Sequence, residues 1–160
     1  MTAEQTAGGL AGSAHWLPGP LISDCYVQGS VAGSVVGGLA GEARHNQFLN
    51  CYAACELFPL KTGDDEPLVG GLFGDVWVTD WGPKAVSCFW DAELSQVNFG
   101  AGSRLVDLGI EIGMGLTTQQ MQNPEVFQDA GWDFDTVWMI CDGDYPRLQW
   151  EAEECDKPQL

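Results

Sequence analysis

The chain has 160 residues, 45% of them apolar, and a net charge of −17 from 23 acidic and 6 basic residues. This length and apolar content are enough for one folded domain with a core. So negative a surface repels nucleic-acid phosphates and anionic lipid headgroups, which excludes nucleic acid as a partner. No apolar stretch approaches the roughly 20 residues that span a bilayer, so membrane insertion is not expected.

A Gly-Gly-Leu-x-Gly motif occurs three times, at Gly8–Gly12, Gly37–Gly41 and Gly70–Gly74. Repeats 20 to 50 residues apart indicate stacked supersecondary units, none of which can bury its apolar face alone. Helical units are excluded because each glycine of the second copy would cost a helix about 1 kcal/mol. The spacing therefore predicts an all-β protein, a right-handed parallel β-solenoid of three to four coils with strands of three to five residues. The repeat glycines are expected to supply a positive φ angle or close coil-to-coil approach.

A second pattern places a short polar residue, a cysteine and an aromatic residue in sequence. It reads Asp24-Cys25-Tyr26, then Asn50-Cys51-Tyr52, then Ser87-Cys88-Phe89. Asp, Asn and Ser bond nearby backbone and favour bends, so each copy predicts a corner followed by a strand. We expect the cysteines to be small buried residues and the aromatic rings to stack along the solenoid, although an exposed ring ladder could bind sugars.

The six cysteines form no Cys-x-x-Cys pair, which argues against a zinc or thioredoxin-like site. An even number in an acidic chain fits an oxidising compartment. Two disulfide arrangements stay open: a bridge within the stack, or one joining Cys141 to Cys155.

The regular pattern has one insertion and changes after Gly115. Lys61–Glu66 is predicted to form a surface loop, and the apolar stretch 97–112 another coil or a hairpin. Thr117 and Asn123 each offer a helix N-cap, so two short helical turns are expected, the second ending near Gly131.

We expect the repeats to occupy residues 1–115, a mixed C-terminal cap residues 116–150, and a loose acidic tail residues 151–160. Within the cap, 136–141 and 145–150 are predicted strands around a turn. Its tryptophans are expected to cover the open coil end that every solenoid must close. Because the first motif begins at Gly8, the chain is interpreted as part of a longer repeat array.

The order of these motifs resembles the GLUG repeat of large bacterial surface proteins and adhesins. The resemblance rests on the cysteine–aromatic strand that runs into Gly-x-Val-x-Gly and then Val-Gly-Gly-Leu-x-Gly. It covers residues 7–150, because Gly115–Met121 and Tyr145–Trp150 look like the segment that closes such arrays. It implies a β-helical stalk or adhesive array in an extracellular or cell-surface setting, with no catalytic residue. The insertion at Lys61–Pro67 and the length of the stretch Val97–Ile112 depart from the pattern.

No catalytic site is expected, since His15 and His45 lie in no metalloprotease spacing and are predicted on loops. Carboxylate clusters at 64–66, Asp133/Asp135 and Asp142/Asp144 leave a non-standard calcium site open. An EF-hand loop starting at Asp142 is excluded because residues 146 and 147 are Pro and Arg where a ligand and a glycine are needed.

The sequence therefore predicts a non-catalytic structural or adhesive module of a secreted or cell-surface bacterial protein. Its expected partners are neighbouring repeats, other copies of itself and surface glycans. Two alternatives stay open: a self-assembling extracellular filament subunit, and a carbohydrate-active β-helix domain with acidic groove residues.

Overall fold

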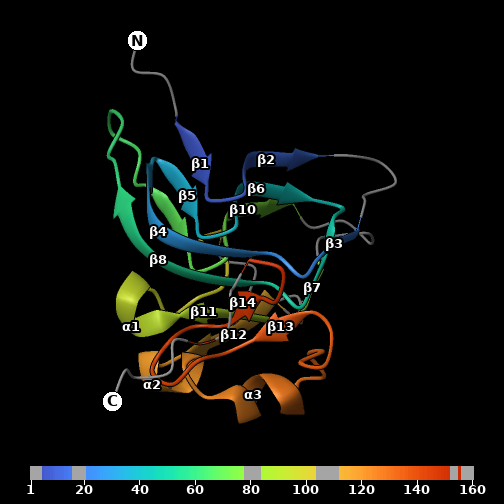
Figure 1. Cartoon of the computed structure of the whole chain (residues 1–160). Helices are drawn as coiled ribbons and strands as arrows, with labels where there is room; N and C mark the ends of the chain where they lie inside the picture. Colours follow the sequence, from blue (N-terminus) through green and yellow to red (C-terminus); the bar gives the residue numbers. More distant parts are fainter. Residues whose placement is uncertain (1–4, 16–20, 78–83, 104–111, 152–154, 156–160) are drawn as a thin grey trace.

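A computed structural model describes residues 5–15, 21–77, 84–103, 112–151 and 155. Short strands are stacked in parallel into a β-solenoid of about three turns, and the helices of the described residues all follow β11 (Figure 1). The predicted fold class is therefore confirmed.

Each coil contributes its strands in the same order. Coil 1 consists of β1 (Thr6–Gly8), β2 (Ala11–His15), β3 (Leu21–Ser23) and β4 (Tyr26–Gly33). Coil 2 consists of β5 (Val35–Gly37), β6 (Ala40–Arg44), β7 (Gln47–Leu49) and β8 (Tyr52–Pro59). Coil 3 consists of β9 (Leu68–Gly70), β10 (Phe73–Trp77) and β11 (Lys84–Asp91), and β12 (Ile112–Leu116) then adds to β11.

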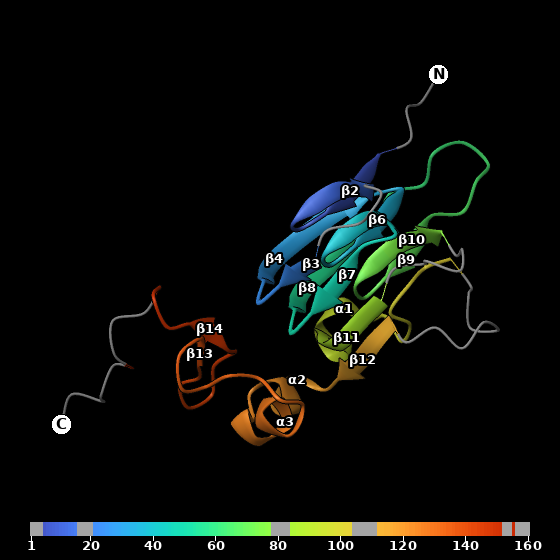
Figure 2. The same ribbon diagram turned by 90° about the vertical axis from the view of Figure 1, so that its right-hand side faces the viewer.

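Stacking these coils produces three parallel sheets. Sheet A has the order β1-β5-β9 and sheet B the order β2-β6-β10. Sheet C contains β3, β7, β11, β8, β4 and β12, with β11 spanning the positions of both β7 and β8. Figure 2 shows the coils side by side, from coil 1 in blue to β12 in orange.

The repeat glycines lie in register and let the coils approach closely. Gly8 pairs with Gly37, and Gly37 with Gly70. A Cβ atom at Gly38 would lie 2.4 Å from both Ala53 Cβ and Gly71 O, a distance that no real Cβ tolerates. None of the three motifs has a glycine with positive φ, so close approach, not backbone conformation, explains them.

The polar residues before the cysteines form the predicted corners. Asp24, Asn50 and Ser87 have φ angles of 52°, 52° and 49°, a left-handed conformation that short polar side chains tolerate best. The cysteines that follow are reduced, and Cys51 and Cys88 are fully buried. Each cysteine thiol donates to the carbonyl two residues earlier, so the corner geometry repeats from coil to coil.

The core inside the stack is built from the repeat positions. Val36 and Leu39 have no exposed surface, and Val31 and Val35 are also buried. Leu72 repeats the position of Leu39 one coil later and is equally buried. The glycine-rich stretch 29–41 is therefore part of the core.

The prediction of three- to five-residue strands was wrong for sheet C. β4, β8 and β11 each have eight residues. Where β8 and β11 meet the C-terminal segment (residues 117–151), both of their faces are covered: Ala53 and Trp90 point into the stack, whereas Tyr52 and Phe89 pack outward against that segment.

This segment covers the side of the stack, not its end as predicted. It contains α2 (Thr118–Met121), α3 (Pro124–Asp129), β13 (Trp138–Met139) and β14 (Arg147–Leu148). Trp138 Nε1 donates to Asp24 Oδ1 of coil 1, and Trp132 Nε1 donates to the Ser87 carbonyl of coil 3. The segment therefore runs across the outer face of sheet C from coil 3 back to coil 1 (Figure 2).

The local elements of this segment agree with the sequence prediction, although β13 and β14 have only two residues each. Thr117 and Gln120 form the expected capping box, and Asn123 caps α3 with Pro124 in its first turn. Helix α1 (Ala92–Ser95), which Asp91 caps, was not predicted from the sequence.

Asp91 is the polar centre of the packing between stack and segment. Its side chain is fully buried and accepts hydrogen bonds from Leu94 N, Thr118 Oγ1 and Tyr145 Oη at 2.7 to 2.8 Å. A buried carboxylate is tolerated only when donors satisfy its oxygens. Burial, followed by the bond to Asp91, raises the pKa of Tyr145 well above its usual range.

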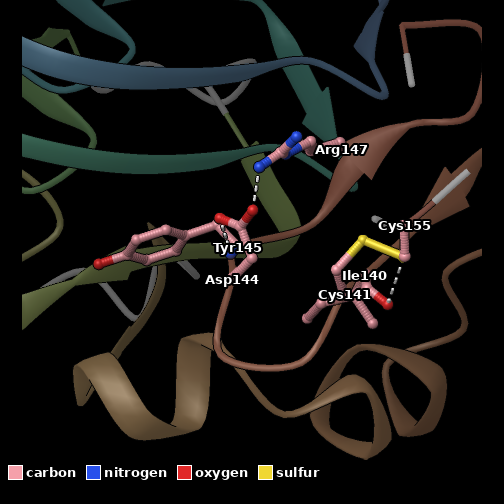
Figure 3. Close-up of a disulfide and its surroundings, with 6 residues drawn as sticks. All are labelled: Ile140, Cys141, Asp144, Tyr145, Arg147 and Cys155. Carbon is pink, nitrogen blue, oxygen red and sulfur yellow. Dashed lines mark hydrogen bonds and ion pairs between the residues drawn. A yellow bond between two sulfur atoms is a disulfide. The ribbon is translucent and has the colours of Figure 1, made fainter. Parts of the chain in front are cut away.

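A disulfide closes the end of the segment. It joins Cys141 to Cys155, one of the two arrangements that the sequence left open (Figure 3). The Asp144–Arg147 ion pair lies nearby, and the Tyr145 ring points away from the disulfide.

The insertion forms a loop between β8 and β9, as predicted, with a bridge between Thr62 and Asp65. Residues 99–103 add a partial fourth coil, since Ala101 pairs with Phe73. The rest of the stretch predicted as a coil or hairpin, residues 104–111, lies outside the described residues.

Two glycines of one row provide a graded test of coil packing. A Cβ at Gly41 would lie 2.6 Å from Gly12 O and from Thr6 Cγ2, whereas at Gly12 the nearest atom, Thr6 O, would be 3.1 Å away. Gly41→Ala is expected to lower the free energy of unfolding by about 1–3 kcal/mol through overpacking. Gly12→Ala should cost clearly less in the same urea titration, and equal losses would contradict this packing.

Alkaline pH should weaken the docking of the C-terminal segment. Burial and the hydrogen bond that Tyr26 donates to Glu151 raise the pKa of Tyr26 from 10.0 to about 12. A pKa raised in the folded state contributes stability that is complete below pH 10 and is lost as pH rises toward 12. Tyr26→Phe should therefore show a shallower loss of urea midpoint across this window. Identical pH profiles for the two proteins would contradict the prediction.

Candidate functional site

The outer face of sheet B carries the best candidate for a binding surface. After each glycine motif, β2, β6 and β10 alternate between residues inside and outside the stack. Ala14, Ala43 and Val76 point inward and are buried. The outward positions form two rows in register, Ser13, Glu42 and Asp75 in one and His15, Arg44 and Trp77 in the other. We call these six residues the sheet B face.

Glu42 is the centre of the sheet B face. Its Oε2 lies 2.9 Å from His15 Nε2, 3.3 Å from Ser13 Oγ and 3.5 Å from an Arg44 terminal nitrogen. One carboxylate oxygen thus holds side chains from two coils. Such a network fixes the geometry of an exposed surface more than it stabilises the fold.

Trp77 provides the apolar part of the face. The Arg44 guanidinium carbon lies 4.1 Å from the centroid of the Trp77 ring, yet Trp77 stays 52% exposed. An exposed cation–π contact of this kind contributes about 0.5–1 kcal/mol and holds the ring in one orientation. The face therefore combines a fixed aromatic surface with carboxylate and guanidinium groups.

Ser13, His15 and Glu42 are the residue types of a hydrolase triad, but their geometry does not match one. In a triad, serine and carboxylate contact opposite nitrogens of the imidazole. Here Ser13 Oγ and Glu42 Oε2 both lie 2.9 Å from the same nitrogen, Nε2. Because both contacts fall on one nitrogen, the three side chains form a surface hydrogen-bond network that lacks the geometry of a triad.

Both histidines were expected on loops between strands, which holds for His45 and not for His15. His15 is the last residue of β2 and belongs to the sheet B face. His45 lies at the corner between β6 and β7 with a φ angle of 57°.

The aromatic ladder is internal, because Tyr52 and Phe89 are buried under the C-terminal segment. Tyr26 stacks on Tyr52 with centroids 5.2 Å apart, and Tyr52 stacks on Tyr145 at 6.2 Å. Tyr52 Oη donates to the Pro146 carbonyl, and burial raises its pKa far above the usual value. Tyr52 and Phe89 therefore pack inside the molecule, whereas Tyr26 at the end of the ladder stays partly exposed.

The carboxylate clusters use their oxygens in local turns. Asp133 Oδ1 accepts from the backbone N–H groups of Asp135 and Thr136, and the Thr136 hydroxyl donates to Oδ2, which lowers the pKa of Asp133. Asp144 pairs with Arg147. In the ranges that the structure covers, no group of three or more His, Cys, Asp or Glu side chains is arranged to hold a metal ion.

The inserted loop borders a surface hollow of about 550 Å³. Its lining includes Asp65 and Glu66, and Glu66 accepts a 2.6 Å hydrogen bond from Lys61. A second hollow of about 460 Å³ has Glu56 as its only carboxylate among the described lining residues. These two hollows therefore contain few carboxylates. In the first hollow, one of the two carboxylates, Glu66, is already paired with Lys61.

The face could have been found from sequence. The residues one and three positions after each motif are Ser13 and His15, Glu42 and Arg44, Asp75 and Trp77. Because side chains alternate along a strand, two such polar or aromatic positions around one buried residue indicate an outward pair.

Calcium removal should not change the stability of the protein. With the oxygens of Asp133 and Asp144 engaged in their own turns, we expect the melting temperature to stay within about 1 °C when calcium is replaced by a chelator at equal ionic strength. A rise of several degrees at millimolar calcium, absent with magnesium, would contradict this expectation.

No family model matches the chain, and no solved structure matches it. It is similar to a "Putative Gly-rich membrane protein" of Evansella cellulosilytica, with 29% identity over 131 residues. The match covers 78% of this chain but only 13% of that protein. Among the residues described here, no helix is long and apolar enough to cross a membrane. The chain thus spans a small part of the length of a glycine-rich bacterial relative.

Proposed function

We propose that the chain is a non-catalytic adhesive module of a secreted or cell-surface bacterial protein, similar to GLUG-repeat arrays, and that the sheet B face binds surface glycans. The observation that carries the proposal is the division of the repeat: the motif residues pack the stack, and the two outward positions after each motif present Trp77, Arg44 and Glu42 on one face.

The chemistry of the face suits neutral sugars. The apolar C–H face of a pyranose ring packs well on an exposed indole, and sugar hydroxyls bond to carboxylate and guanidinium groups. Glu42, Asp75 and Arg44 provide these groups beside Trp77. Anionic polysaccharides are disfavoured by a net charge of −17.

Two further observations support an extracellular setting. The Cys141–Cys155 disulfide is typical of oxidising compartments. The bacterial relative is glycine-rich by its printed name and much longer than this chain, as a repeat array would be. The carbohydrate-active alternative, which needs paired acidic residues in a groove, has less support: one hollow described above has Glu56 as its carboxylate, and the other has Asp65 and a Glu66 that is bonded to Lys61.

Glycan binding should depend on Trp77. In affinity electrophoresis with soluble neutral polysaccharides such as xylan and β-glucan, the chain is expected to be retarded, and Trp77→Ala should weaken binding at least about tenfold, which equals about 1.4 kcal/mol. Trp150→Ala is the matched control, because Trp150 is 80% exposed but lies outside the sheet B face. Absence of retardation in every polysaccharide, or an equal effect of both variants, would contradict the proposal.

A further inference from the structure

Coil 3 departs from the repeat within sheet C. β4 pairs with β8 along all eight residues of both strands. β11 pairs with β8 only at Tyr52 and Ala53, because β11 ends at Asp91 and α1 follows it. In the described structure, Ala54–Pro59 of β8 therefore has a neighbouring strand on the coil 1 side only. We call the position on its other side, where a strand of coil 3 would lie, the sheet C slot.

The second hollow described above occupies this slot. Its volume is about 460 Å³, and its described lining consists of Glu56–Pro59 at the end of β8, Val69 of β9, and Leu94–Val97 at the end of α1 and just after it. Helix α1 packs against β8 beside it (Figure 1). All of these residues lie within the described ranges 52–77 and 84–103, so the slot is a break in the middle of the stack.

The backbone of β8 directs hydrogen-bonding groups into the slot. At the start of the strand, Tyr52 N donates to Cys25 O of coil 1 at 3.1 Å. Just after its end, Leu60 N donates to Gly33 O of the same coil at 2.8 Å. Such groups alternate between the two sides of a strand, so Leu57, an odd number of residues from both, turns its N–H and C=O toward the slot. An extended peptide can add to an edge of this kind as a further strand.

The side chains around the slot differ between its inner and outer sides. Leu57 packs against the core of the stack, and the lining residues Val69, Leu94 and Val97 are also apolar. Glu56 lies on the outer side of β8 and is exposed. None of the ion pairs among the described residues involves Glu56. Because side chains alternate along a strand, a peptide in the slot would place every second side chain on the apolar lining and the others beside Glu56.

Charge indicates the partner. The described lining of the slot contains a carboxylate but no Lys, Arg or His, and a net charge of −17 attracts cationic segments and repels acidic ones. We infer that the sheet C slot binds an extended segment of a partner protein in which apolar and basic residues alternate. The segment adds a strand beside β8, with its basic side chains near Glu56. The described lining shares no residue with the sheet B face, so the inference does not depend on glycan binding.

Fluorescence anisotropy on the full chain tests this inference with a labelled peptide of alternating lysine and valine. We expect saturable binding below about 1 mM peptide. A peptide of the same composition, with its valines and lysines in two blocks, has the same charge but cannot match the two sides of the slot. It should bind at least about threefold more weakly.

Two variants of equal charge change separate the slot from general attraction. Glu56→Lys should weaken binding of the alternating peptide at least about threefold, because it replaces attraction by repulsion. Glu125→Lys is the matched control, since Glu125 is exposed on α3 and does not line the slot. If Glu56→Lys fails to fold by circular dichroism, Glu56→Gln and Glu125→Gln replace the pair, with a smaller loss expected for the first and none for the second.

Amide hydrogen exchange adds a readout that charge alone does not change. Saturating peptide should slow the exchange of Leu57 N–H at least about tenfold, because a strand in the slot accepts a bond from it. The N–H of Gly131, which donates to Gln128 O after α3, should keep its rate. Absence of binding up to about 1 mM, equal binding of the two peptides, equal effects of the Glu56 and Glu125 variants, or unchanged exchange at Leu57 would overturn the inference.

Discussion

Close approach of neighbouring coils is the constraint on which this structure depends. The strands of successive coils can form backbone hydrogen bonds only if no side chain at the corners holds the coils apart. The rows of glycines meet this condition because they carry no Cβ atom. The row Gly9, Gly38, Gly71 leaves room for the inward side chains of sheet C, which are Val27, Ala53 and Trp90. Backbone bonds then run from coil to coil, as in Leu10 N to Leu39 O and Leu39 N to Leu72 O. The lack of a Cβ atom at these glycines therefore allows the backbone hydrogen bonds between coils, and these bonds in turn hold the coils close together.

Much of this arrangement could be predicted because the repeat is visible in the residues that pack it. Glycine spacing predicted the stacking, and the polar residue before each cysteine predicted a corner even at Ser87, although its left-handed conformation was not foreseen. The side-on position of the C-terminal segment was missed because the alternation in β8 and β11 was not used. Tyr52 and Phe89 are apolar on the side opposite Ala53 and Trp90, and a strand with two apolar faces is covered on both. Helix α1 was missed because Asp91, its cap, reads as the end of a strand.

The surfaces of the stack differ in what they leave free. The C-terminal segment covers the outer face of sheet C, and its contacts with coils 1 and 3 make it part of the fold. Sheet B keeps an outer face of charged and aromatic side chains around Glu42. In coil 1, Leu10 is 42% exposed, whereas Leu39 and Leu72 at the same repeat position are fully buried. The exposed surfaces therefore differ in chemistry, since sheet B is polar and charged whereas coil 1 exposes the apolar side chain of Leu10.

Amide hydrogen exchange across the glycine-rich stretch 35–41 tests the central claim most directly. A glycine-rich linker exchanges within seconds, whereas the middle coil of a closed stack exchanges only by global unfolding. The coil packing predicts that Leu39 and Ala40, whose N–H groups both donate to Leu72 O, are among the most protected amides of the chain. Exchange at these two residues as fast as in the loop at 60–67 would contradict the stacked coil and the account built on it.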